Sequence, residues 1–341
     1  MTREQVLLGA ALREETRILE LGPSFAPIAA KADGWRTFVV DHLDRAGLRA
    51  KYADAGVTLE RIEAVDGIWQ DGQLHEAVPA TLHGGFDRLI ASHVIEHMPD
   101  PAGFLASAEA LLQPEGTIAL AIPDHRYCFD YFRPVSTTGE VLEAMFARRS
   151  RHPARALWDQ RAYAIVMDGT TAWGQHAVAA PAFLSPFPTA TDTAALFTAA
   201  PSIFEDCHAW RFTPASFALI LLELGALGLC TWQMETLEGP SGCEFFAILR
   251  RRAGVPGGDP TGLAAERLRL LRARIVEQGE QAGFAAWAQE IGEAPSLQSL
   301  QTRLIAQERR LAEVERVLGR IGRRLAPFAA LWRKLGPKRP D

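Results

Sequence analysis

The sequence predicts an α/β fold with a doubly wound sheet, and two observations support this prediction. From Arg17 onward, short apolar segments alternate with helical segments. The apolar segments lack strict alternation of apolar and polar residues, which is typical of parallel strands buried on both faces of a sheet. Strands and helices that alternate in this way indicate a mostly parallel sheet covered by helices.

Five apolar segments between residues 17 and 123 are expected to form strands. They are residues 17–22, 37–41, 59–65 (the weakest), 86–92 and 117–123. A helix is expected over 101–112, between the last two strands. It begins just after Asp100 and ends before a turn at 113–116.

Residues 124–212 interrupt this rhythm and are rich in aromatic residues, Pro and Thr, with helices expected near 138–149 and 153–167. We interpret this segment as a substrate-side insertion. After it, Thr213 and Pro214 begin a helix by the rule of a small polar cap followed by Pro. A hairpin over 228–251 then adds an antiparallel edge strand. Residues 1–252 are therefore expected to form one domain.

A helical tail is predicted after a linker at 253–262, which is rich in Gly and Pro. Within the tail, residues 263–341, apolar residues recur at heptad steps from Leu297 onward, which favours a coiled coil over 297–325 and a homo-oligomer. Pro327 should stop or kink the coil. A long helix packed back on the body is the alternative.

Charge is unevenly distributed along the chain. The net charge is −5, yet residues 297–341 hold 11 basic and 4 acidic residues. The net charge of the whole chain argues against a nucleic-acid partner held mainly by phosphate contacts. The basic, amphipathic segment after Pro327 could contact an anionic membrane surface. The alternative is a soluble oligomer whose tail merely closes the coil.

Cysteine usage and hydropathy predict a cytoplasmic protein. The four cysteines lie far apart without a CxxC pair, which excludes a disulfide scaffold and a zinc ribbon. We expect no signal peptide and no membrane-spanning helix. At most, the protein would be peripheral at the inner face of the membrane.

A nucleoside-binding site is indicated by the ends of the first two strands. Asp41 closes the second strand about twenty residues after the Gly22 turn, the arrangement that binds a ribose diol. Gly22 stands without the further glycines of a dinucleotide loop, so the turn is a poor phosphate cradle. This argues against an NAD(P)-dependent oxidoreductase. A nucleoside ligand without phosphates does not require such a phosphate-binding loop.

Longer stretches carry a family resemblance. The segments ILELGPSFAPI, FVVDHLD and FDRLIASHVIEHMPDPAGFLASAEALLQPEGTIALAIPD resemble class I S-adenosylmethionine-dependent methyltransferases, with a Rossmann-like fold, and are close to the type 11 subgroup. The segments PDHRYCFDYFRP, CHAWRFTPASF and CEFFAILRR resemble bacterial methyltransferases often encoded with polysaccharide-synthesis enzymes. The resemblance covers residues 17 to about 252, and it implies S-adenosylmethionine as cofactor and a sugar or glycan as acceptor.

The resemblance also assigns roles to individual residues. Glu20 and Gly22 would contact the methionine moiety, and Asp41 the ribose, with His42 beside it. Asp66 would contact the adenine amino group. Ser92 and His93 would lie beneath the sulfonium.

The segment His93-Val94-Ile95-Glu96-His97 admits three interpretations. At helical spacing, His93, Glu96 and His97 could converge, as in the inverted zinc-protease motif. They could instead hold a divalent metal against acceptor hydroxyls. We favour a third interpretation without metal, in which His93 lines the cofactor pocket while Glu96 and His97 cap and pack the next helix.

Methyl transfer to an oxygen is favoured because no N/D-P-P-Y motif follows the fourth strand, where Ala91-Ser92-His93-Val94 stands. A hydroxyl acceptor needs a base, and His is suited to that role near pH 7. His125 and His208 are the candidates. The alternative function is a non-catalytic scaffold that presents the coiled coil to a membrane-associated assembly.

Overall fold

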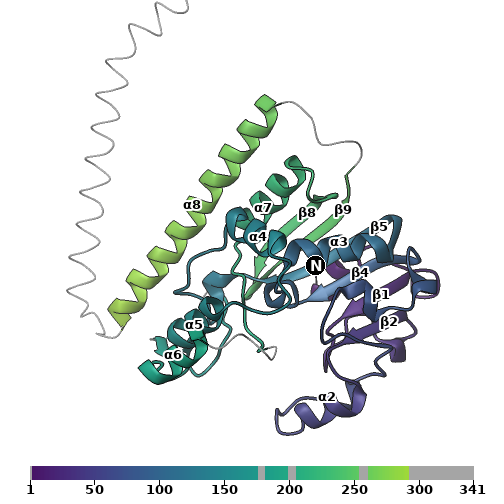
Figure 1. Ribbon diagram of the computed structural model, residues 1–341, viewed down its shortest axis with the longest axis horizontal. Coiled ribbons are helices and arrows are strands. Elements are labelled where there is room, and N and C mark those ends of the chain that lie inside the picture. The colour runs from purple at the N-terminus through teal and green to yellow at the C-terminus, as the bar shows by residue number, and fades with distance from the viewer. Residues whose placement is uncertain (1, 176–180, 199–204, 253–259, 292–341) are drawn as a thin grey trace, which may run out of the picture. The chain divides into compact units, whose positions relative to one another are not determined.

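The computed structural model describes residues 2–175, 181–198, 205–252 and 260–291. The central feature is a seven-stranded sheet in the order β3-β2-β1-β4-β5-β9-β8 (Figure 1). Its strands are β1 (Arg17–Leu21), β2 (Arg36–Asp41), β3 (Gly67–Ile68), β4 (Phe86–Ser92), β5 (Leu112–Pro123), β8 (Trp232–Ser241) and β9 (Glu244–Arg251).

The pairing of these strands confirms the doubly wound, Rossmann-like class. The strands β3, β2, β1, β4 and β5 pair in parallel, and β9 is antiparallel to both β5 and β8. The predicted hairpin therefore supplies the antiparallel strand β9. Two successive antiparallel pairings restore the direction, so β8 runs parallel to β5 at the edge of the sheet.

Helices pack around this sheet and also form part of the inserted segment (Figure 1). They are α1 (Arg3–Leu8), α2 (Arg45–Lys51), α3 (Pro101–Leu111), α4 (Thr138–Phe146), α5 (Ala154–Tyr163), α6 (Ala190–Thr198), α7 (Pro214–Ala226) and α8 (Pro260–Ile291). The cap signals read from the sequence are confirmed. Asp100 accepts a hydrogen bond from the Gly103 N–H at 2.9 Å, and Thr213 and Ser216 form a capping box that begins α7.

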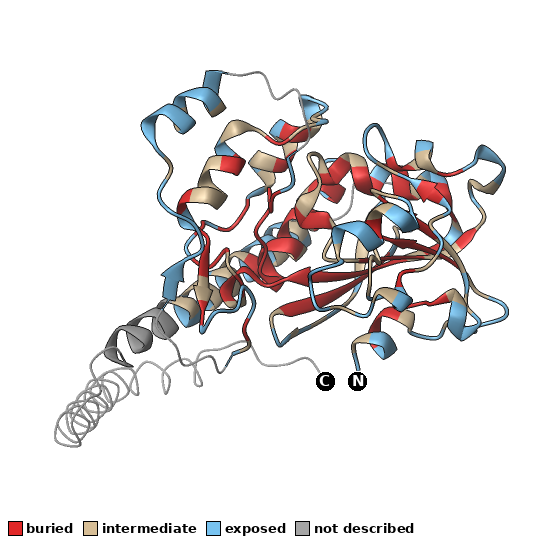
Figure 2. Cartoon of the chain, turned by 90° about the horizontal axis from the view of Figure 1, so that it is seen from below, coloured by how far each residue is buried: buried red, intermediate tan, exposed pale blue. Residues whose placement is uncertain are grey.

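Both faces of the sheet are buried, which explains the absence of alternation in the strand sequences (Figure 2). On one face, Ile18 and Ile90 pack with α1. On the other, Leu19 and Leu89 join a larger core with α3, α4 and α7. Successive residues of a strand point to opposite faces, so a sheet covered on both sides needs apolar residues at nearly every position.

Three expected boundaries differ from the structure. The strand over 59–65 is wrong: residues Leu59–Arg61 form a 3-10 turn, and β3 is only two residues long. Pairing with β2 begins only at Asp66, just before β3. The Asp66 N–H donates to the Val39 carbonyl, and the Asp66 carboxylate accepts from the Val39 N–H at 2.7 Å. Residues 113–116 belong to β5 rather than to a turn. The helix expected over 153–167 ends at Tyr163, before the small sheet of β6 (Ile165–Met167) and β7 (Pro181–Phe183).

Helix α8 contacts the body of the protein along its first part. The chain divides into compact units Met1–Ala285 and Ala286–Asp341. Within the first unit, Glu277 accepts from the Ala215 N–H at 3.1 Å, and Glu280 pairs with Arg126 at 2.7 Å. No helix among the described residues is long and apolar enough to cross a membrane. The coiled coil over 297–325 and the basic segment after Pro327 lie outside those residues and stay predictions.

Candidate active site

The ends of β1 and β2 meet at the carboxyl edge of the sheet, as the sequence predicted. Gly22 has a φ of 60°, and a Cβ there would lie 3.3 Å from the Val94 Cγ2, so glycine suits this turn. Asp41 is buried and accepts a hydrogen bond from the Ser24 N–H at 3.1 Å. Its other oxygen lies 2.6 Å from the Nδ1 of His42. The strand end and the glycine turn therefore form one hydrogen-bonded unit.

Glu20, in β1, holds the loop that follows the Gly22 turn. Its two carboxylate oxygens accept hydrogen bonds from the N–H groups of Ile28 and Ala29, at 2.6 and 3.0 Å. Burial raises the pKa of Glu20 to about 7, although the two hydrogen bonds oppose this shift. The resemblance placed Glu20 beside the methionine moiety. In the structure this carboxylate binds the backbone, so it fixes the path of the loop after β1. Its contact with the methionine moiety stays a prediction.

Asp66 is also engaged with the protein. Besides its bond to the Val39 N–H, its carboxylate pairs with the ammonium of Lys31. This position joins β2 to the segment before β3. The role predicted from the resemblance, contact with the adenine amino group, stays a prediction.

The end of β4 is tied to helix α1 and to β9. Ser92 accepts a hydrogen bond from the Arg3 guanidinium, and Glu244 lies 3.2 Å from the same group. The Nε2 of His93 lies 2.8 Å from the other oxygen of Glu244. Residues far apart in the sequence therefore meet beside the Gly22 turn.

The structure does not bring His93 together with Glu96 and His97. His93 has a left-handed backbone with a φ of 54°, and Ile95–His97 form a 3-10 turn rather than an α-helix. The spacing of an α-helix therefore does not apply to this segment, and His93 faces Glu244 instead. The convergence that the protease and metal interpretations required of these three residues is wrong.

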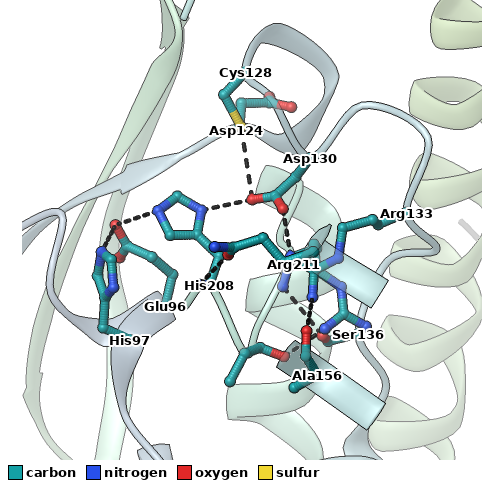
Figure 3. A network of polar contacts seen from close by, with 12 residues as sticks. Glu96, His97, Asp124, Cys128, Asp130, Arg133, Ser136, Ala156, His208 and Arg211 are labelled. Atoms are coloured by element: carbon teal, nitrogen blue, oxygen red, sulfur yellow. Dashed lines mark hydrogen bonds and ion pairs between the residues drawn. The ribbon is translucent and has the colours of Figure 1, made fainter. Parts of the chain in front are cut away.

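A different group of polar side chains is formed by residues that follow β4 and residues of the inserted segment (Figure 3). We call it the imidazole cluster, and it consists of Glu96, His97, Asp130, Asp206 and His208. His208 Nδ1 lies 2.5 Å from an Asp130 oxygen, and His97 Nδ1 lies 2.7 Å from an Asp206 oxygen. The two imidazole rings meet edge to face with centroids 4.6 Å apart.

Charges around Asp130 fix its protonation state. This carboxylate is buried, yet His208 and Arg133 lower its pKa to about 2, against the effect of burial. Arg133 lies 2.5 Å from its second oxygen. An ionised Asp130 accepts the Nδ1–H of His208, which leaves Nε2 of that ring turned toward Glu96.

His125, the other predicted base, has a contrasting environment. It is buried in a 3-10 turn (His125–Tyr127), and neither ring nitrogen has a hydrogen-bond partner among the described residues. Burial lowers the pKa of His125 to about 4. The imidazole is therefore neutral near pH 7. Next to it, Asp124 and Arg126 form a buried bidentate pair.

Sequence reasoning missed the imidazole cluster as a unit. It named Glu96 and His97 from one segment and His208 from another, but nothing in the spacing joined them. The available signal was local sequence: in HVIEH, His97 directly follows Glu96, and in EDCHAW, His208 lies two residues after Asp206. Only the path of the inserted segment brings the two together.

Comparison with known proteins supplies the family. A family described as "Methyltransferase domain" matches residues 3–223. No curated protein sequence matches the chain.

Among solved structures, a provisionally assigned Zn-dependent alcohol dehydrogenase from Rhodobacter sphaeroides is 12% identical, with 73% of this chain and 89% of that chain covered and a TM-score of 0.39. A provisionally assigned S-adenosylmethionine-dependent methyltransferase from Listeria monocytogenes is 11% identical, with coverage of 73% and 98% and a TM-score of 0.37. The DhpI–SAH complex is 15% identical, with coverage of 70% and 78% and a TM-score of 0.33. These likenesses are too weak to identify the chain, whereas the family match spans residues 3–223 of its 341 residues. Since that match spans well over half of the sequence, the chain belongs to the methyltransferase-domain family.

Proposed function

We propose that the protein transfers a methyl group from S-adenosylmethionine to a hydroxyl oxygen of a sugar or glycan intermediate. The family match supports methyl transfer. One observation supports the cofactor: the hydrogen bond between Asp41, at the end of β2, and Ser24, in the turn after β1. This arrangement sets a carboxylate beside a glycine turn at the carboxyl edge of a parallel sheet, where nucleosides bind.

The residues at this edge fit a nucleoside that lacks phosphates. The Gly22 turn lets a ligand approach the backbone. In the proposed complex, the Asp41 carboxylate, which is buried and already accepts hydrogen bonds from Ser24 and His42, would also accept from the ribose hydroxyls. S-adenosylmethionine supplies a methyl group bonded to a positively charged sulfur. Ser92 and His93, at the end of the neighbouring β4, would lie beside that sulfur.

The imidazole cluster suits the acceptor side. A hydroxyl that attacks the methyl carbon must lose its proton, and the cluster offers two imidazoles held by carboxylates. His208 is better placed for this step than His125, because Asp130 orients its ring whereas His125 has no orienting partner among the described residues. His208 would act either by taking the proton itself or by holding a cation that lowers the pKa of the hydroxyl.

The glycan class of acceptor rests on the sequence resemblance of the inserted segment and of β9 to methyltransferases encoded with polysaccharide-synthesis enzymes. A membrane-bound acceptor would agree with the basic segment after Pro327. Attachment of that segment to an anionic membrane remains part of the proposal.

Calorimetry tests the cofactor. We expect micromolar binding of S-adenosylmethionine and of its demethylated product, and no binding of NAD. Absence of binding by the first two would contradict the proposal and leave the scaffold as the better hypothesis. Incubation with methyl-labelled cofactor and pools of sugar nucleotides or lipid-linked glycans then tests the acceptor. Label transferred only to amines would contradict the assignment to oxygen.

A further inference from the structure

Three potential ligand groups converge inside the imidazole cluster without touching. Nε2 of His97 lies 3.6 Å from the Oε1 of Glu96, and Nε2 of His208 lies 3.9 Å from the same oxygen. The ligand atoms of the three residues all lie within 4.8 Å of one another. Ligands of a tetrahedral zinc ion, at about 2.1 Å from the metal, are about 3.4 Å apart. The spacing is therefore close to that of a metal site.

Glu96 provides the second, independent observation. The residue is 1% exposed, and neither of its carboxylate oxygens has a hydrogen-bond partner in the part of the chain that the structure describes. A buried carboxylate without hydrogen bonds is costly, unless it is paired with a cation. Its Oε1 points to two imidazole nitrogens (Figure 3). A cation bound between these three atoms would have two nitrogen ligands and one oxygen ligand.

The outer partners of the two histidines agree with this interpretation. Each ring uses its Nδ1 to bind a carboxylate, Asp206 for His97 and Asp130 for His208. A carboxylate can only accept, so Nδ1 carries the proton, and the lone pair of a neutral ring is on Nε2. Histidines that bind metals are held in this way, with the second nitrogen donating to a carboxylate or a carbonyl group.

We propose that Glu96, His97 and His208 form a binding site for a divalent transition metal of the zinc type. Two imidazoles and one carboxylate suit zinc better than magnesium or calcium, which prefer oxygen ligands alone. Three protein ligands leave a position open for an oxygen ligand. The side chains of His97 and Asp206 are 25% and 62% exposed, so an ion has access from their side.

The site deepens the proposed function, because His208 then serves as a metal ligand on the acceptor side rather than as the base. An acceptor hydroxyl could occupy the open position. Metal binding itself, however, follows from the geometry of the cluster alone.

A second group, Cys128, Asp130 and His208, is a weaker candidate. It would need the Nδ1 of His208, which is already bound to Asp130. It would also need a thiolate, whereas burial raises the pKa of Cys128 well above its ordinary value. Asp130 is moreover paired with Arg133. The Glu96 set requires none of these changes.

The test measures metal binding by the full-length chain after removal of bound metals with EDTA. Zn²⁺ is titrated by calorimetry, and Co²⁺ by its visible absorption, which reports the coordination geometry. We expect one ion per chain and a Co²⁺ spectrum typical of four-coordination. Glu96→Gln and His97→Gln should each weaken Zn²⁺ binding by more than about 100-fold, since losing only an outer partner costs about 10–100-fold.

Two further variants sharpen the test. Asp206→Ala should weaken Zn²⁺ binding by about 10–100-fold, because it removes only the outer partner of His97. Glu205→Gln is the matched control. It changes the neighbouring exposed carboxylate, which pairs with Arg161 outside the cluster, and should leave binding unchanged. Circular dichroism verifies that each variant is folded, and the partly exposed His97 keeps the test valid if Glu96→Gln does not fold.

Failure of this inference and failure of the proposed function are distinguishable. Absence of Zn²⁺ binding, or binding that both Glu96→Gln and His97→Gln leave unchanged, would overturn the metal site, whatever the affinity for S-adenosylmethionine. Conversely, Zn²⁺ binding that is lost in these variants would support the metal site even if the protein did not bind S-adenosylmethionine. The missing cofactor binding would then overturn the proposed function and leave the metal site intact.

Discussion

Glu20 should make the stability of the protein depend on pH in a characteristic direction. Burial raises the pKa of this carboxyl from its ordinary value of 4.5 to about 7 in the folded protein. Between these two values the folded state therefore keeps a proton that the unfolded state releases. The stability contributed by Glu20 is full below pH 4.5, and it is lost as the pH rises to 7. The shift corresponds to about 3 kcal/mol in the free energy of unfolding.

The variant Glu20→Gln isolates this effect, because glutamine has nearly the same shape and does not titrate. Urea unfolding of both proteins is measured at several pH values from 4.5 to 7.5. The wild-type stability minus that of the variant should fall by about 3 kcal/mol over this range. His125 has the opposite effect, since burial lowers its pKa to about 4, but it is present in both proteins and cancels in the difference.

The direction of the change decides between two physical causes. Burial disfavours the ionised carboxylate, whereas the hydrogen bonds from Ile28 and Ala29 favour it. A difference that rises with pH would show that the hydrogen bonds outweigh burial and would refute the reasoning. A difference that does not change with pH would show that Glu20 titrates alike in both states.

Three further predictions concern the cofactor, the core and the tail. Asp41→Ala should weaken S-adenosylmethionine binding by about 1.5–3 kcal/mol in calorimetry, because hydrogen bonds to a charged group are lost. Trp232→Ala should lower the free energy of unfolding in urea by about 3–5 kcal/mol, because the indole is fully buried and donates to the Leu105 carbonyl at 2.9 Å. Truncation after Ile291, which keeps α8, should convert a dimer or trimer to a monomer in light scattering.

Each of these experiments has its own control. Asp54→Ala changes an exposed carboxylate and should not alter cofactor affinity, so an equal loss in both variants would count against a role of Asp41 in ribose binding. Phe146 is 73% exposed, and Phe146→Ala should change stability by less than about 0.5 kcal/mol. A full-length protein with the mass of a single chain would contradict the predicted coiled coil.

The class of fold and the order of its main elements follow from local pattern. The buried strands at 17–21 and 86–92 are recognisable in the sequence as continuous apolar segments. Asp100 and Thr213 indicate where helices begin, because each forms hydrogen bonds within the first turn of its helix. Gly22 and Asp41 were predictable for the same reason. Parallel strands bring their carboxyl ends to one edge, so the position of each residue in its own strand decides where it lies.

Other features depend on contacts between distant segments. The sequence could not show that Glu20 turns to the backbone of Ile28, or that His93 adopts a left-handed conformation and faces Glu244. Both follow from the path of loops, which no periodicity constrains. The strand expected at 59–65 failed similarly, because the bonds between Asp66 and Val39 decide where the chain joins β2.

The sequence alone determined a doubly wound sheet with a glycine turn and an acidic strand end at its carboxyl edge, because these depend on residues close together in the chain. Only the tertiary structure decided that Glu96 and His97 face His208. These residues come from the segment after β4 and from the inserted segment before α7, and helical spacing had instead suggested His93. The inserted segment packs against the core that covers the sheet, and this packing brings His208 to Glu96 and His97. The geometry of these three residues therefore arises from tertiary packing rather than from their spacing in the sequence.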